Sequence, residues 1–164
     1  MAHAEGNSTI AQGNSSHSEG VLTFASGIGS HAEGYGTTAS GLYSHSEGNG
    51  TKASGNYSHA EGEGTTASTY YTHSEGYHTT ASNESEHAEG RYNVTHSATT
   101  THGYSGNTQH SVGIGTSDND RKNAFEIMQN GDVYIIGIGG YDGTNAAQSG
   151  VKTLQQILID AGLV

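Results

Sequence analysis

The chain has 164 residues, of which 26 are glycine and none is proline, cysteine or tryptophan, and its formal net charge is -11. Only 30% of the residues are hydrophobic, which is little for a globular core of this length, and the lack of cysteine excludes disulfides and thiolate metal sites. Five Lys and Arg residues are too few to neutralise a phosphate backbone, and no stretch approaches the roughly 20 apolar residues of a spanning helix, so we expect neither nucleic-acid binding nor membrane insertion.

The tetrapeptide His-(Ala/Ser)-Glu-Gly recurs seven times with a strict spacing of 14 residues. After each of the first six histidines, Thr follows at the sixth position and Ala at the eighth. A fixed short period is typical of a solenoid, in which each unit buries its apolar face only by stacking on its neighbours. We therefore predict that the repeats form one continuous rod.

The high glycine content and the absence of a 3.6-residue apolar period exclude helix in the repeats. Fourteen residues divide into two short strands and two tight turns, so seven coils predict a rod roughly 34 Å long. Side chains alternate along a strand, which places His and Glu on one face and the intervening Ala or Ser on the other. Because buried charges are costly, we expect the small residues inside the roll and His and Glu outside.

The outward face should be free to vary, as the residue four positions after each histidine does, yet the His and Glu positions are constant. We interpret this constancy as an interface between identical chains, in which these side chains hydrogen-bond to each other. The predicted interface residues are His3, Glu5, His17, Glu19, His31, Glu33, His45, Glu47, His59, Glu61, His73, Glu75, His87 and Glu89.

These repeats resemble the head repeats of trimeric autotransporter adhesins (YadA-like heads) and related repeats in phage and prophage tail-fibre proteins. The usual family form is close to Asn-Ser-Val-Ala-Ile-Gly, and this chain contains a similar segment at 111–115. Aligning it with the repeat at 30–34 places His31 on Val112 and Glu33 on Ile114. The resemblance covers residues 3 to about 115 and implies a homotrimer of left-handed parallel β-rolls, with Val112 and Ile114 also facing the three-fold axis.

After His87 the repeat register decays, and Thr101 stands where an eighth histidine is due. The segment from Phe125 to Ile136 predicts two strands about an Asn130-Gly131 turn, a strong hairpin signal. Residues 137–150 are rich in glycine and predict a loop. From about Gly150 a short helix is expected, and three copies of its apolar stripe would form a trimer cap or the start of a stalk. The interface residues predicted on this helix are Leu154, Ile157 and Ala161.

We thus predict an all-β, homotrimeric chain in three parts: a β-roll over 1–116, a hairpin and Gly-rich connector over 117–150, and a C-terminal helix over 151–164. The run from Asp120 to Ile135 is similar to the segment that follows the repeats in phage tail fibres. This similarity favours a tail-fibre origin over a bacterial adhesin.

Catalysis has little support, since no serine stands in a Gly-x-Ser-x-Gly elbow, and we expect no enzyme. Three chains would bring three His and three Glu into each layer, enough to bind a cation. Mutual hydrogen bonding explains all seven motifs without an ion. We therefore expect no metal and no other cofactor, with metal binding as the alternative.

Exposed tyrosines at variable positions are the candidate ligand-binding residues, because aromatic rings stack on sugars and contact protein surfaces. They are Tyr35, Tyr43, Tyr57, Tyr70, Tyr71 and Tyr77. The alternative is that they shield the edges of the roll. The predicted function is a trimeric fibre or head for surface attachment, on a virion tail fibre or a bacterial cell surface. Its partners would be two further copies of the chain and a host-surface glycan or protein receptor; the alternatives are an adhesin head and an inert shaft.

Overall fold

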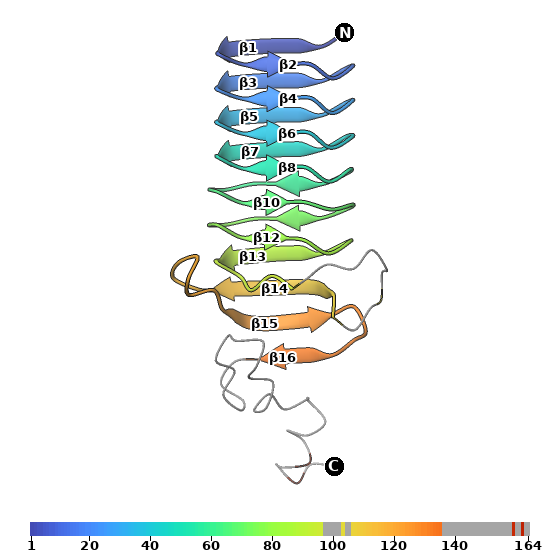
Figure 1. The fold of residues 1–164 in the computed structure, drawn as a ribbon, viewed down its shortest axis with the longest axis vertical. Helices are drawn as coiled ribbons and strands as arrows, with labels where there is room; N and C mark the ends of the chain where they lie inside the picture. Colours follow the sequence, from blue (N-terminus) through green and yellow to red (C-terminus); the bar gives the residue numbers. More distant parts are fainter. Residues whose placement is uncertain (97–102, 104–105, 136–158, 160–161, 163–164) are drawn as a thin grey trace.

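The computed structural model describes residues 1–96, 103, 106–135, 159 and 162. Over these residues the chain is an all-β parallel solenoid, in which successive coils stack along the long axis from the N-terminal end (Figure 1). The predicted all-β parallel solenoid and its 14-residue coil are confirmed. Six complete coils are followed by a seventh first strand and by three further strands.

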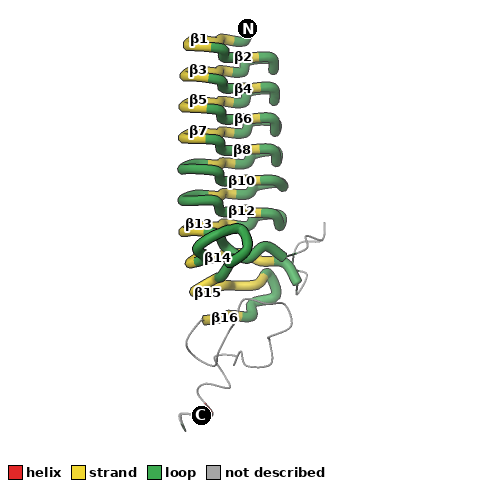
Figure 2. The backbone as a smooth tube through the Cα atoms, turned by 60° about the vertical axis from the view of Figure 1, so that its left-hand side comes forward, coloured by secondary structure: helices red, strands yellow, loops and turns green. Residues whose placement is uncertain are grey.

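Each coil contributes one strand to each of two sheets, which Figure 2 shows as two rows. The first strands, which carry the His and Glu residues, are β1 (His3–Asn7), β3 (His17–Val21), β5 (His31–Tyr35), β7 (His45–Asn49), β9 (His59–Ala60), β11 (His73–Ser74) and β13 (His87–Arg91). The second strands are β2 (Ile10–Ala11), β4 (Phe24–Ala25), β6 (Thr38–Ala39), β8 (Lys52–Ala53), β10 (Thr66–Ala67) and β12 (Thr80–Ala81). Every strand pairs in parallel with its equivalent in the next coil, so that His17 lies beside His31 and Glu19 beside Glu33.

The interior of the roll is narrow and filled by small residues, as predicted. Ala32, Ala39 and Ala60 are fully buried, and Ser46 takes the same inward position in its coil. Where serine replaces alanine, its hydroxyl bonds across the interior to a threonine, as Ser46 does to Thr51 at 2.8 Å. A dry interior tolerates these hydroxyls because they pair with each other.

Glycine in the tetrapeptide lets neighbouring coils approach at the first turn. Gly34 has φ of +105°, and a Cβ atom at this position would lie 2.2 Å from the carbonyl oxygen of Gly48. Both the backbone conformation and the lack of space therefore require glycine here. This requirement explains why the tetrapeptide ends in glycine in every coil.

The solenoid continues into β14 (Thr108–Ile114), which pairs in parallel with β13. His110 lies beside His87, Val112 beside Glu89 and Ile114 beside Arg91. The alignment that placed His on Val112 and Glu on Ile114 was therefore wrong by two residues. The cause is an insertion: 23 residues separate His110 from His87 where the repeat has 14.

The chain then reverses direction, and β15 (Asn123–Met128) and β16 (Val133–Ile135) extend the sheet in antiparallel fashion. The predicted hairpin is confirmed. The amide of Met128 donates to the carbonyl of Asp132 at 2.8 Å, and Gly131 has φ of +92° in the turn. The predicted C-terminal helix, with Leu154, Ile157 and Ala161, lies outside the described residues.

Candidate functional site

Eight histidines stack along the outer face of the first-strand sheet. They are His3, His17, His31, His45, His59, His73, His87 and His110. Neighbouring ring centroids are 4.7–5.0 Å apart and the ring planes lie within 13° of each other. The stack follows directly from the parallel in-register pairing, which repeats each side chain at one strand spacing.

The glutamates two residues further along connect neighbouring coils. The Nε2 atom of His45 lies 3.2 Å from Oε1 of Glu33 in the preceding coil. Six such pairs have Nε2–Oε1 distances of 3.2–3.3 Å: Glu19–His31, Glu33–His45, Glu47–His59, Glu61–His73, Glu75–His87 and Glu89–His110. At the N-terminal end, Glu5 and His17 are 3.9 Å apart. We call these pairs and the histidine stack the His–Glu ladder.

The His–Glu ladder is about one third exposed, with His45 and Glu33 each at 35%. Exposed ion pairs contribute at most about 1 kcal/mol each, because water screens them. The His–Glu pairs therefore stabilise a single chain only slightly. This small gain does not explain why His and Glu recur in every coil.

The histidines of the ladder change the pKa of Glu61. Partial burial opposes ionisation of this carboxyl, but the hydrogen bond from His73 and the charges of His59 and His73 outweigh it and lower the pKa of Glu61. Any stability from this shift is present above the unfolded pKa and is lost as the pH falls through the folded value.

His110 is a ladder residue that the sequence prediction missed. Its Nε2 lies 3.2 Å from Oε1 of Glu89, and its ring packs edge-on against Phe125. A signal was present, since His110-Ser111-Val112-Gly113 keeps the tetrapeptide pattern with Val112 in place of Glu. Val112 therefore does lie beside the Glu column, whereas Ile114 falls at the variable position and is 48% exposed.

The six candidate tyrosines fall on two separate corners of the roll. Tyr35 is the last residue of β5 and Tyr77 takes the equivalent position in its coil, whereas the other four occupy the turn after the second strand. Tyr43, Tyr57 and Tyr71, which we call the tyrosine stack, have centroids 5.4–5.6 Å apart and planes within 18°. Each also has positive φ, between +53° and +60°.

Mutual stacking limits what the tyrosine stack can bind. Tyr57 has Tyr43 on one side and Tyr71 on the other, so a neighbouring ring lies against each face although the residue is 51% exposed. Sugars stack on ring faces. Tyr57 is thus a poor sugar platform, while Tyr35, which is 56% exposed, remains open.

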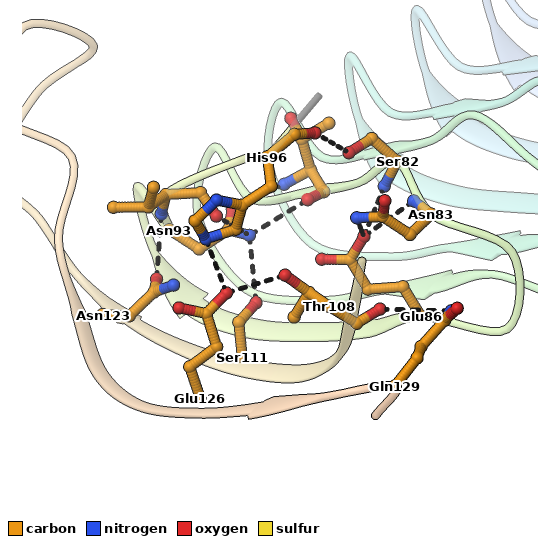
Figure 3. Close-up of polar contacts among 12 residues, drawn as sticks. Ser82, Asn83, Glu86, Asn93, His96, Thr108, Ser111, Asn123, Glu126 and Gln129 are labelled. Carbon is orange, nitrogen blue, oxygen red and sulfur yellow. Dashed lines mark hydrogen bonds and ion pairs between the residues drawn. The ribbon is translucent and has the colours of Figure 1, made fainter. Parts of the chain in front are cut away.

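A buried polar cluster closes the C-terminal end of the roll (Figure 3). In the sixth coil, Glu86 takes the place of a serine whose hydroxyl bonds the chain three residues back, as Ser44 does to Gly41. Glu86 is 1% exposed, and its Oε2 accepts hydrogen bonds of 2.8–2.9 Å from the amide of Ser82 and from the amide and side chain of Asn83. Burial outweighs these bonds and raises the pKa of Glu86 to about 7.

A second buried carboxyl, Glu126 on β15, receives its contacts from two other segments. Its Oε1 lies 2.8 Å from Nε2 of His96 and accepts a 2.7 Å hydrogen bond from the hydroxyl of Thr108. The hydrogen bond and the negative charge of Glu126 raise the pKa of His96 although burial opposes this. Gln129 adds a link by donating from Nε2 to the carbonyl of Glu84 at 2.6 Å. The cluster therefore joins the last complete coil to the hairpin.

Sequence reasoning missed this cluster, because its hydrogen bonds join residues up to 45 positions apart. The one local signal was the change in the sixth coil, where Asn83 and Glu86 replace the usual Gly and Ser. The hydrogen bonds of the buried polar cluster hold the sixth coil, β14 and β15 together.

No known protein family, curated protein or solved structure matches this chain. Within the part of the chain that the structure describes, there is no helix of the length and hydropathy needed to cross a membrane.

Proposed function

We propose that this chain is the homotrimeric β-roll segment of a surface-attachment fibre, with the His–Glu ladders of three chains facing a common axis. The observation that carries the proposal is the ladder itself: His and Glu recur in every complete coil, yet in one chain they remain about one third exposed. An interface with two further copies would bury them and account for their constancy. The left-handed roll and the three-fold symmetry come from the resemblance to trimeric adhesin heads.

A phage or prophage tail fibre is the preferred setting, and the head of a bacterial trimeric adhesin is the alternative. In both, the residues at variable repeat positions on the two corners of the roll would contact the target, which would be a glycan or a protein. Apolar side chains gather on these corners, including Leu22 at 53% exposure and Tyr35 at 56%. Tyr35 is the preferred contact residue because its ring is not part of the tyrosine stack.

The attachment role is tested by binding of the labelled native protein to a panel of bacterial cells and host-surface glycans. We expect binding that Tyr35→Ser weakens at least tenfold. Tyr57→Ser is the matched control, because the ring faces of Tyr57 are covered, and it should change binding much less.

The second candidate function, an inert shaft that sets reach, is favoured by the near identity of the coils. It predicts a stable trimer that binds no cell or glycan in the panel. Binding that survives both tyrosine substitutions unchanged would remove these residues from the proposed contact surface.

A further inference from the structure

We propose that the His–Glu ladder also binds divalent transition-metal ions, with Zn²⁺ as the best-suited ion and one ion held at each His–Glu pair. Five overlapping groups of two histidines and a glutamate along the ladder have their ligand atoms within 4.8 Å of one another. Imidazole nitrogen and carboxylate oxygen are both common Zn²⁺ ligands. Both ligands of a pair come from the same chain, so the site does not depend on the proposed trimer.

The distance within each pair suits two ligands of one ion as well as it suits a hydrogen bond. The Nε2–Oε1 separation is 3.2–3.3 Å in six pairs, at the long end of the range of about 2.7–3.2 Å that is usual for N–H···O hydrogen bonds. Two ligands at 2.0–2.2 Å from a tetrahedral Zn²⁺ are about 3.3–3.6 Å apart. A Zn²⁺ ion therefore fits between His and Glu with little movement of either side chain.

The stacking of the rings makes each pair a separate site. The ring centroids of His31 and His45 are 4.7 Å apart and the ring planes differ by 2°, so the in-register repeat separates equivalent nitrogens by about the same distance. Two nitrogens bound to one Zn²⁺ are at most about 4.2 Å apart, which is twice the bond length. Neighbouring histidines therefore do not share an ion, and two coordination positions at each pair stay open to water or to groups of another chain.

Access and charge also favour ion binding. In the single chain the paired side chains of the ladder are about one third exposed, so an ion reaches them from solvent before the chains associate. A net charge of -11 raises the local concentration of cations. Ions in neighbouring coils repel each other, so we expect successive ions to bind progressively more weakly.

The test is a titration of metal-free native protein with Zn²⁺ by calorimetry, with the bound metal also measured by mass spectrometry after dialysis. The ladder variant carries Glu33→Gln, Glu47→Gln and Glu61→Gln, which remove three of the six pairs while keeping side-chain shape. The control variant carries Glu63→Gln, Glu84→Gln and Asp132→Asn, which change the net charge equally outside the ladder. Circular dichroism shows whether both variants keep the native fold.

We expect the native protein to retain at least one Zn²⁺ per chain, the ladder variant to bind about half as many ions at saturation, and the control variant to bind as many as the native protein. Bound Co²⁺ should give the visible spectrum of a four-coordinate ion. No retained Zn²⁺, an equal loss in both variants, or a six-coordinate Co²⁺ spectrum would overturn the proposal. Measuring the oligomer mass with and without chelator shows whether the chain forms a trimer. A failure to bind metal is therefore distinguished from a failure to form the proposed trimer.

Discussion

At the scale of single residues, the fold depends on positions where side chains must be absent. Gly34 and Gly36 lie two residues apart and both have positive φ, at +105° and +63°. A Cβ atom on Gly34 would meet the backbone of Gly48, whereas a Cβ atom on Gly36 would meet nothing within 4 Å. The two positions therefore separate the cost of a clash between coils from the cost of backbone strain alone.

We expect Gly34→Ala to lower the free energy of unfolding by about 3 kcal/mol, because the coils must move apart as well as accept a strained backbone. Gly36→Ala should cost about 1 kcal/mol, from strain only. Chemical denaturation of both variants measures the difference. Equal losses of unfolding free energy in the two variants would show that close contact between coils is not what requires glycine at position 34.

Glu86 is the residue whose titration should matter most for stability. Its pKa rises from 4.5 to about 7 on folding, so the folded chain holds the proton more tightly than the unfolded chain. The resulting stability is complete below pH 4.5 and is lost as the pH rises through 7, a decrease of about 3 kcal/mol. His96, with a raised pKa, acts in the same direction, since its contribution is lost as the pH rises through its folded value.

Glu86→Gln should remove most of this decrease between pH 5 and pH 8. Unfolding of the native protein and the variant at both pH values measures it, with Glu84→Gln as a neighbouring control that should retain the native pH dependence. A native protein equally stable at both pH values would contradict the buried, protonated state of Glu86.

At the scale of elements, the strands of the regular coils were predictable from the sequence. The position of β14, after the last complete coil, was not. The first strands begin at the histidines and Ala closes each second strand, because the 14-residue period fixes parallel register through the glycine turns. The strand β14 was displaced by the nine-residue insertion after His87, which a fixed period does not anticipate. The contacts of Glu86 and Glu126 depend on tertiary packing of distant segments, for which the sequence offers no spacing rule.

The hairpin of β15 and β16 offers a local test at this scale. Gly131→Ala should destabilise the turn by about 1 kcal/mol, because φ at this position is +92°. Hydrogen exchange should become faster for the amides of β15 and β16 and stay unchanged in β5 and β7. Faster exchange throughout the coils would mean that the hairpin and the roll unfold as one unit.

At the scale of the whole molecule, the small interior of the roll explains why we expect several chains. Alanine, serine and threonine fill the coils, so one chain buries little apolar surface, while its His–Glu ladder and apolar corners remain exposed. Long β-solenoids gain stability from every added coil. Side-by-side association of chains would add a second source of stability, because it would bury the ladder along its whole length.

Association of the chains along the His–Glu ladder determines the mass of the native protein in solution, which sedimentation equilibrium measures at micromolar concentration. We predict a single species of three times the 16.9 kDa chain mass. Replacing three consecutive ladder histidines, His31→Ala, His45→Ala and His59→Ala, should shift it toward the monomer, while His78→Ala, outside the ladder, should not. A stable 16.9 kDa monomer for the native protein would contradict an interface between chains at the His–Glu ladder.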